Sequence, residues 1–262
     1  MTANRDQVII VTGGGSGIGR AVALLAAERG ARIGILDRDA GASRAAAADA
    51  LGRGAAAAAG LGCDVTAERQ VAEALAVLEA DLGSPTGLFA AAGLDIGGFA
   101  HELRLDSWQQ VIATNLTGTF LSCRAVIRAM LASGHGGSVV CCSSPAAFVG
   151  FTAGAASAYS ASKGGISALV RSLAVDYARY GIRVNALVPG PTETPLMWAN
   201  VSEADRPAML AALQAEVPLG RLADPDEPAR AALWLLSPES SYVTGSHLVC
   251  DGGVLAKASI SV

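Results

Sequence analysis

A tyrosine and a lysine lie four residues apart, as Tyr159 and Lys163, near the start of an expected helix, Ser157–Tyr180. Residues at this spacing share one helix face. A nearby ammonium favours the charged form of a phenol, and a free tyrosine, with a pKa near ~10, would otherwise keep its proton at neutral pH. The pair could therefore work as a general acid and base. The same spacing also occurs by chance in ordinary helices, so its meaning depends on the rest of the chain.

A glycine-rich stretch, residues 12–19, follows a short β-branched run and opens a helical pattern. Glycines at such a turn let the backbone approach a pyrophosphate, and the helix start offers free N–H groups and a positive dipole end. Arg20 and Ala21 stand where a nucleoside triphosphate loop needs Lys and Ser or Thr, so the stretch is interpreted as a dinucleotide-binding turn. The residues expected to contact the cofactor are Gly13, Gly15, Ser16, Gly17, Ile18 and Gly19.

An aspartate, Asp37, ends the second expected strand, eighteen residues past Gly19. A carboxylate at this place hydrogen-bonds the ribose hydroxyls of NAD and repels the 2′-phosphate of NADP. Arg38 follows and could pair with such a phosphate, so both cofactors stay open, with NAD favoured by Asp37. Asp64 and Val65, after the third expected strand, are placed to meet the adenine edge.

The composition is that of an apolar, weakly acidic chain. Its 262 residues suit one α/β domain, residues 1–262. The chain is 52% hydrophobic and 16% charged, with a net charge of −4, which favours a sizeable core. The lack of a basic stripe argues against a nucleic-acid partner. No apolar run is long enough to cross a membrane, and the N-terminus up to Gln7 does not resemble a signal peptide.

The five cysteines and three histidines indicate a reducing compartment rather than a metal centre. The cysteine count is odd and no Cys-x-x-Cys occurs, so we expect buried free thiols in a cytoplasmic protein. The adjacent Cys141 and Cys142, in an expected strand, would face opposite sides of a sheet. Because His101, His135 and His247 are isolated in the sequence, no metal site is expected.

Short β-branched runs alternate with longer helical patterns along the whole chain. This alternation is typical of βαβ units, and predicts a doubly wound α/β fold with a parallel sheet and helices on both faces. The expected strands are Val8–Val11, Arg32–Leu36, Ala56–Leu61, Gly87–Ala91, Ser138–Cys142, Arg183–Val188 and Ser246–Cys250. The expected helices are Gly17–Arg29, one in the alanine-rich stretch from Ala40, Ala67–Leu82, Asp106–Ala132, Ser157–Tyr180 and Pro225–Leu236.

One insertion breaks this rhythm after Val188. It begins Pro-Gly-Pro-Thr-Glu-Thr-Pro and continues as an amphipathic, helix-like stretch, Leu196–Gln214. A segment that leaves the carboxyl end of a strand in this way can close over a substrate. We expect a substrate lid at residues 190–215, with a plain surface helical hairpin as the alternative.

Taken in order, these motifs resemble the short-chain dehydrogenase/reductase family, in its simple single-domain form, over essentially the whole chain. Further matching residues are Asn115, Ser144, Val184-Asn185-Ala186, Pro189-Gly190 and Thr194. The resemblance implies a Rossmann-like sheet of seven parallel strands and a nicotinamide cofactor, here NAD(H). It also implies a homotetramer or homodimer.

The resemblance further implies roles for individual residues. Tyr159 would be the general acid/base on the substrate oxygen, while Lys163 would lower its pKa and bind the nicotinamide ribose. Ser144 would orient the substrate oxygen, and Asn115 would hold a proton-relay water beside Lys163. Other cofactor contacts would come from Ala91, Ala92, Gly93, Val188, Pro189, Gly190, Thr192 and Thr194.

Two departures from the family pattern matter. The family's Asn-Asn-Ala-Gly reads Ala90-Ala91-Ala92-Gly93 here, which removes hydrogen bonds near the adenosine pocket but no catalytic group. Ser144 precedes Tyr159 by fifteen residues, two more than in the family. The intervening loop, Pro145–Ala158, therefore either bulges over the substrate site or moves the serine role to Ser143.

The favoured hypothesis is an enzyme that interconverts a secondary alcohol and a ketone with NAD, on a neutral, hydrophobic or cyclic small molecule. The residues expected around the substrate are mostly apolar, with no obvious Arg or Lys for a carboxylate. They are Leu94, Ile96, Ser144, Ala146, Phe148, Phe151, Tyr159, Leu196, Met197 and Trp198. A 3-oxoacyl thioester reductase is one alternative, and would prefer NADP and a basic docking surface. A non-catalytic NAD-binding regulatory protein is the other, and would not need Asn115, Ser144, Tyr159 and Lys163 together.

Overall fold

The computed structural model describes residues 7–151 and 154–257. Its centre is a seven-stranded sheet in the order β3-β2-β1-β4-β5-β6-β7, with every neighbouring pair parallel. The strands are β1 (Val8–Thr12), β2 (Arg32–Asp37), β3 (Ala57–Gly62), β4 (Gly87–Ala90), β5 (Gly137–Cys142), β6 (Ile182–Pro189) and β7 (His247–Cys250). The doubly wound, Rossmann-like fold expected from the sequence is confirmed.

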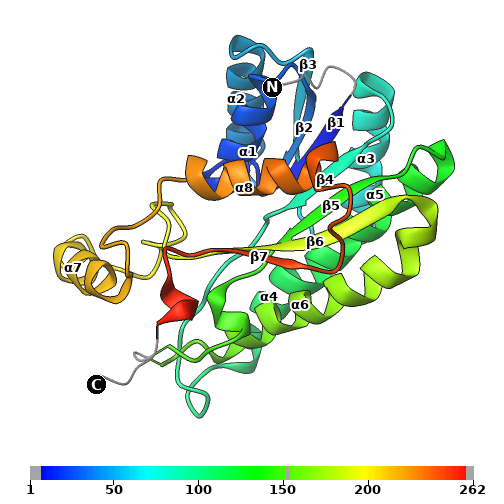
Figure 1. Ribbon diagram of the computed structural model, residues 1–262. Coiled ribbons are helices and arrows are strands. Elements are labelled where there is room, and N and C mark those ends of the chain that lie inside the picture. Colours follow the sequence, from blue (N-terminus) through cyan, green and yellow to red (C-terminus); the bar gives the residue numbers. More distant parts are fainter. Residues whose placement is uncertain (1–6, 152–153, 258–262) are drawn as a thin grey trace.

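Helices cover both faces of the sheet (Figure 1). One face is covered by α1 (Gly17–Ala27), α2 (Ala40–Gly52) and α8 (Asp226–Leu236), and the other by α3 (Glu68–Leu82), α5 (Gly118–Ser133) and α6 (Ser157–Tyr177). Successive strand residues enter opposite cores: Ile9 packs toward the first group of helices and Ile10 toward the second. Because both faces are buried, the strands are continuous apolar runs.

The strand order reverses at β1, which pairs with β2 on one side and with β4 on the other. In an open α/β sheet, ligands bind beyond the carboxyl ends of the strands at such a switch point. The glycine-rich turn leaves β1 here, and the loop that contains Ala91, Ala92 and Gly93 leaves β4 here. The loops after β5 and β6 leave the same edge of the sheet.

The prediction of one unbroken helix over Asp106–Ala132 is wrong. It consists of α4 (Leu105–Ile112), a π-helical turn (Ala113–Thr117) and α5. Within the turn, the Asn115 side chain bonds to residues outside the helix, and the Thr119 hydroxyl donates to the Asn115 carbonyl at 2.6 Å. Such π turns inside helices often occur at functional sites.

Most other element boundaries differ from the sequence expectation by one to three residues. The helix that carries Tyr159 ends as an α-helix at Tyr177 and finishes in a 3₁₀ turn, Ala178–Tyr180. Strand β3 lies one residue later than expected, because its residues pair in register with β2 from Arg32 to Asp37.

The insertion after β6 is not helical from Leu196. Turns occupy residues 195–201, and α7 (Arg206–Glu216) begins later, with a proline in its first turn. Proline has no N–H to donate, which suits a helix start. In Figure 1, α7 stands away from the sheet, beyond the carboxyl ends of the strands.

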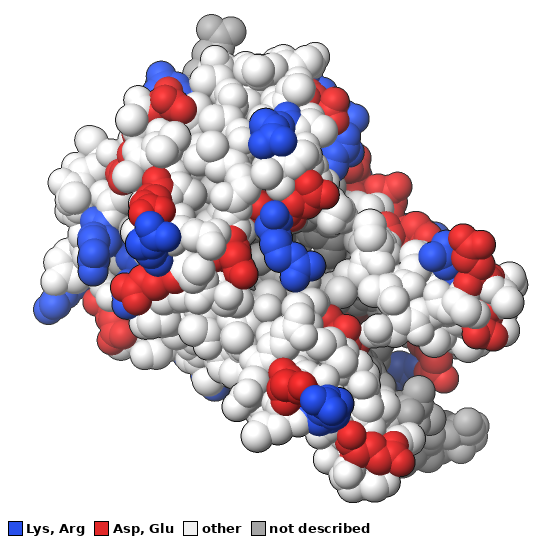
Figure 2. Space-filling view, turned by 180° about the vertical axis from the view of Figure 1, so that it is seen from behind, with Lys and Arg blue, Asp and Glu red and all other residues white. Residues whose placement is uncertain are grey.

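On the face shown in Figure 2, basic and acidic side chains of the described residues are interspersed among a larger uncharged surface. Among the described residues, no helix is long and apolar enough to cross a membrane, and no cluster of His, Cys, Asp or Glu could hold a metal ion. The sulfur of Cys141 lies 3.6 Å from that of Cys123 in one core, while Cys142 packs on the other core, as the strand alternation predicts.

Candidate active site

Tyr159 and Lys163 lie in the first two turns of α6. The Lys163 ammonium is 5.4 Å from the centroid of the Tyr159 ring. Lys163 is 5% exposed, and its ammonium donates a hydrogen bond of 2.7 Å to the carbonyl of Cys142, the last residue of β5. The end of the strand therefore holds the ammonium beside the phenol. A buried cation in this position acts on the phenol through a medium of low dielectric constant, where charge interactions are strong.

The two serines after β5 have different environments. The Ser143 hydroxyl lies 3.3 Å from the Lys163 carbonyl and 3.1 Å from the Ser167 hydroxyl, so it is used in packing against α6. The Ser144 hydroxyl accepts a hydrogen bond from the Ala146 N–H and caps a 3₁₀ turn, Pro145–Ala147. Among residues 7–151 and 154–257, its own proton has no acceptor and is free to donate. This geometry favours Ser144 over Ser143 as the residue that orients substrate.

Asn115 is fully buried and fixes the loop that follows β4. Its amide oxygen accepts from the Leu94 N–H at 2.8 Å, and its amide nitrogen donates to the Leu94 carbonyl at 2.9 Å and to the Ser162 hydroxyl at 3.1 Å. The Asn115 side chain thus joins the β4 loop to α6 next to Lys163. The proton-relay role implied by the family resemblance stays a prediction.

The glycine-rich turn is closely packed against its neighbours. A Cβ on Gly13, whose φ is +66°, would lie 2.7 Å from the Ala92 nitrogen, and one on Gly19 would lie 2.2 Å from the Gly13 carbonyl oxygen. The Ala91 N–H donates to the Thr12 carbonyl. These contacts leave room only for glycine and bring the β1 and β4 loops together, although the family's asparagines are absent.

The acidic residue after β2 contacts the same turn. One oxygen of Asp37 accepts a hydrogen bond of 2.9 Å from the Gly15 N–H, and the other accepts from the Asp39 N–H. Arg38 is exposed. Asp64 accepts from the Thr66 N–H and hydroxyl, and the buried Val65 packs so closely on Gly118 that a Cβ there would lie 2.6 Å from it.

These residues fit a nicotinamide dinucleotide. Ser16, at the cap position of α1, makes no side-chain hydrogen bond to the helix, so the first-turn N–H groups are not capped by a side chain. Free N–H groups at a helix start, with a close-packed glycine turn, suit a pyrophosphate. Thr194 approaches this turn from the β6 insertion, since a Cβ on Gly17 would lie 3.2 Å from its methyl group.

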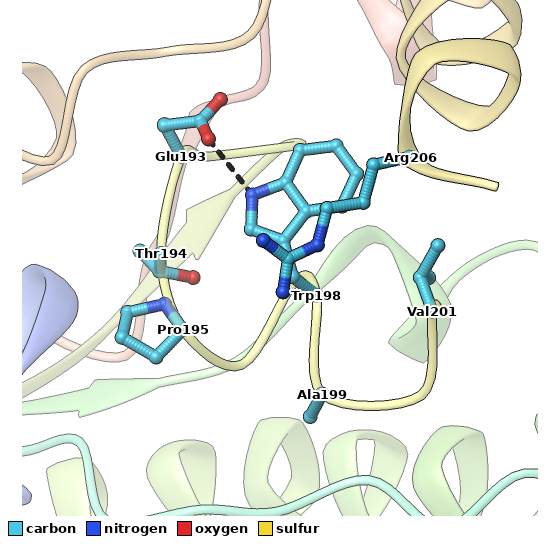
Figure 3. Close-up of a pocket in the computed structure, with 7 residues that line it drawn as sticks. All are labelled: Glu193, Thr194, Pro195, Trp198, Ala199, Val201 and Arg206. Carbon is cyan, nitrogen blue, oxygen red and sulfur yellow. Dashed lines mark hydrogen bonds between the residues drawn. The ribbon is translucent and has the colours of Figure 1, made fainter. Parts of the chain in front are cut away.

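The insertion after β6 holds an open depression of about 610 Å³ (Figure 3). Its lining residues are Glu193, Thr194, Pro195, Trp198, Ala199, Val201 and Arg206. The Trp198 indole N–H donates to Glu193 at 2.8 Å, and the Arg206 guanidinium lies 6.0 Å from the indole ring. Arg206, a residue of the expected lid, therefore brings a cation to this depression. The β6 end itself is fixed, because the Gly190 N–H donates to Cys250 and the Thr192 hydroxyl to Gly190.

The other expected substrate residues are spread out. Ala146 is buried beneath the loop after β5, whereas Phe151 and Leu196 are largely exposed. The ring of Phe148 meets His247 of β7 edge to face, with centroids 5.5 Å apart. The roles of these residues toward substrate stay predictions.

Several known proteins are similar to this chain in sequence and in fold. A family model described as enoyl-(acyl carrier protein) reductase matches residues 13–255. 2-(S)-Hydroxypropyl-CoM dehydrogenase 3 of Xanthobacter autotrophicus is 38% identical over 253 residues, covering 96% of this chain and 98% of that protein. This chain belongs to the short-chain dehydrogenase/reductase family.

Two further members of the family are similar over nearly their whole lengths. Cis-4-hydroxycyclohexanecarboxylate dehydrogenase of Sinomonas cyclohexanicum is 42% identical over 254 residues, covering 96% of this chain and 97% of that protein. The crystal structure of levodione reductase has a TM-score of 0.90 at 31% identity, covering 97% of this chain and 99% of that one. The protein is an oxidoreductase that acts on CH–OH groups with a nicotinamide cofactor.

Two features of this short-chain dehydrogenase/reductase escaped the sequence reasoning. Asp95, in the β4 loop, has a buried carboxylate oxygen without a hydrogen-bond partner among the described residues. Ala155, in the lengthened loop before Tyr159, has a φ of +59°, a conformation that side chains disfavour. A single charge in the apolar, glycine-rich run Gly93–Gly98 was the signal that could have identified Asp95.

Proposed function

We propose that the protein oxidises neutral secondary alcohols with NAD, and reduces the matching ketones with NADH. The observation that carries the proposal is the buried Lys163 ammonium, held by Cys142 beside the Tyr159 ring. A phenol next to a buried cation can accept the hydroxyl proton in oxidation and return it in reduction. The bound cofactor supplies the hydride chemistry.

Three groups of the chain prepare this proton transfer. Ser144 donates its free proton to the substrate oxygen and so fixes the reacting carbon relative to Tyr159. Lys163 is held beside the phenol because its ammonium donates a hydrogen bond to the Cys142 carbonyl. Asn115 holds the β4 loop and α6 together, which keeps the loop beside the site from moving.

The preference for NAD rests on Asp37. Its carboxylate accepts from Gly15 at the carboxyl end of β2, where the adenosine ribose of the cofactor is expected. The 2′-phosphate of NADP would place a second negative charge beside this carboxylate and would be repelled. Arg38 is the one residue in this turn that favours NADP, and it lies exposed to solvent.

The substrate class is supported by the apolar lining and by relatives. Leu94, Ile96 and Met197 supply apolar surface along the loops expected around the substrate. One relative is named for a hydroxycyclohexanecarboxylate; its ring supports a cyclic alcohol, while the neutral charge of the substrate proposed here rests on the apolar loops alone. Another relative, 39% identical, is named 3-oxoacyl-[acyl-carrier-protein] reductase, which supports a second candidate, a 3-oxoacyl thioester.

The test measures the turnover of a panel of substrates by the change in NADH absorbance. Cyclohexanol, cyclohexanone and 2-octanol are assayed with NAD(H) and with NADP(H), and acetoacetyl-CoA is assayed with both reduced cofactors. We expect turnover of the cyclic pair with NAD(H). A kcat/KM that is highest for acetoacetyl-CoA would replace the proposal by the thioester reductase, and no turnover of any compound would refute both.

We also propose that the chain assembles as a homotetramer or homodimer through α5 and α6. Ala161, Gly164 and Ala168 on α6 are exposed or half-exposed, and a Cβ on Gly164 would meet nothing. The next residue, Gly165, packs on Leu116 of its own chain. Multi-angle light scattering gives the molar mass that tests this. The apolar C-terminal segment Val254–Val262 is a second candidate contact between subunits, and its residues 258–262 lie outside the described residues.

We place the protein in the cytoplasm on the state of its thiols. Cys63, Cys123 and Cys141 are buried and free, and burial raises the pKa of the Cys63 thiol to about 11. Buried free thiols suit a reducing compartment. Fractionation with an antibody against the native chain tests the location.

A further inference from the structure

Asp95 lies at the junction of three segments that border Tyr159 and Lys163. Its neighbour Leu94 is held by both ends of the Asn115 amide. Three residues on, the Gly98 N–H donates to the Ala155 carbonyl at 2.8 Å, just before α6. From the insertion after β6, the Asn200 amide donates to the Asp95 carbonyl at 3.2 Å. The backbone of Asp95 is therefore fixed between the β4 loop, the loop before Tyr159 and the expected lid.

The carboxylate of Asp95 is not used by this framework. Its Oδ1 atom is buried and has no hydrogen-bond partner among residues 7–151 and 154–257. Burial raises the pKa of the carboxyl, and the Lys163 ammonium opposes that rise. The carboxyl, on a half-buried residue, is thus partly desolvated and within the electrostatic reach of the proposed catalytic lysine.

A buried carboxylate oxygen without a partner is unfavourable and calls for an explanation. The other unpartnered buried atom among the described residues, the His247 Nε2, belongs to a ring that packs on Phe148 in the loop before Tyr159. Asp95 differs because its unpaired atom is an acceptor that bears charge, and its chain neighbours, Leu94 and Ile96, are apolar residues expected around the substrate. An acceptor in an apolar lining specifies one polar group of a ligand.

We propose that Asp95 is a specificity residue that accepts a hydrogen bond from a second hydroxyl group of the substrate. The preferred substrates are then cyclic diols, or the matching hydroxyketones, rather than simple alcohols. This inference rests on the proposed function, since it names the substrate class of the same site. It also means that a carboxylate on the substrate is repelled by Asp95.

The size of the preference follows from the unpaired acceptor. A site that is built to bond a hydroxyl discriminates strongly against the analogue without it, because the buried acceptor then stays unpaired. We expect kcat/KM for the best diol to exceed that for the simple alcohol by at least about tenfold, the ratio that corresponds to about 1.4 kcal/mol.

The experiment measures kcat and KM of the full chain with NAD for cyclohexanol, for the 1,2-, 1,3- and 1,4-cyclohexanediols and for 2-aminocyclohexanol. The variants are Asp95→Leu, which removes the acceptor, and Asp95→Asn, which keeps one amide oxygen in the same shape. The control is Glu102→Gln, which neutralises an exposed acid in the same loop. NADH binding and the melting temperature of each variant report whether the fold is intact.

The expected result is a diol preference in the wild type and in Glu102→Gln. That preference should be lost in Asp95→Leu and reduced in Asp95→Asn, mainly through KM for the diol, whereas Glu102→Gln should keep the wild-type turnover of cyclohexanol. If Asp95→Leu does not fold, the Asp95→Asn result decides.

Three outcomes overturn the inference. Equal kcat/KM for cyclohexanol and every diol in the wild type would refute the role of Asp95 but not the proposed function. A diol preference that persists in Asp95→Leu would have the same meaning. A stronger preference for 2-aminocyclohexanol than for any diol would assign Asp95 to an ammonium instead. No turnover of any alcohol would remove the proposed function, and this inference with it.

Discussion

The cofactor side and the substrate side of this site are built differently. Around β1 and β2, glycines touch backbone so closely that a Cβ on Gly19 would lie 2.2 Å from a carbonyl oxygen. On the substrate side, Phe148 is 49% exposed and Phe151 43%, Ala155 is strained, and Asp95 keeps an unpaired oxygen. A close-packed half suits a ligand common to a whole family. A looser half, made of loops, suits a ligand that differs between members.

The largest expected effect lies where the two sides meet. Tyr159→Phe removes only the proposed acid/base oxygen, so turnover should fall by about 10²- to 10⁴-fold, while the dissociation constant of NADH stays the same. Stopped-flow turnover and NADH fluorescence titration measure the two quantities. Normal turnover in this variant would refute the assignment of Tyr159 as the acid/base. Weaker NADH binding would mean that Tyr159 also contributes to the cofactor side.

The close packing of the cofactor side predicts the next effect. In Gly19→Ala the new methyl group meets the Gly13 carbonyl, so the turn must shift, and the NADH dissociation constant should rise by roughly tenfold, or about 1.4 kcal/mol. The matched control is Gly52→Ala, at the end of α2, where a Cβ would meet nothing within 4 Å. Equal NADH affinities in the two variants would contradict the idea of a rigid cofactor side.

The choice of dinucleotide tests a single charge on that side. Asp37→Ser keeps an acceptor for the Gly15 N–H but removes the negative charge, so the ratio of kcat/KM for NAD to that for NADP should fall by about tenfold. Asp81→Ser, which neutralises an exposed acid on α3, serves as the control. A ratio that is unchanged at position 37 would shift the selection to some other residue.

The smallest expected effect probes the strain on the substrate side. Ala155→Gly relieves a φ of +59°, and glycine adopts such angles without steric penalty. Relief of this strain should stabilise the fold by roughly 0.5–1 kcal/mol, less the added chain entropy, as measured by urea unfolding. Ala156→Gly, where φ is an ordinary −113°, should instead destabilise. Destabilisation at both positions would show that Ala155 is not strained.

Much of the fold could be predicted from local patterns in the sequence. The buried strands, the helix starts and the alternation of the two were placed within a few residues, because both sheet faces are covered and each strand is a continuous apolar run. The π turn at Asn115 was not readable, because it depends on hydrogen bonds to Leu94 and Ser162, the latter 47 residues away. The late start of α7 was missed because the apolar periodicity from Leu196 continues through turns.

The candidate site divides in the same way. By itself the sequence determined the glycine turn, the acid that ends β2, and the tyrosine and lysine on one helix face, since each depends on residues close together in the chain. Only the tertiary structure decided which serine is free, what holds Lys163, and where Phe148 packs. It alone brought Asp95 to Asn200 across 105 residues, because such contacts depend on where distant loops meet at the edge of the sheet.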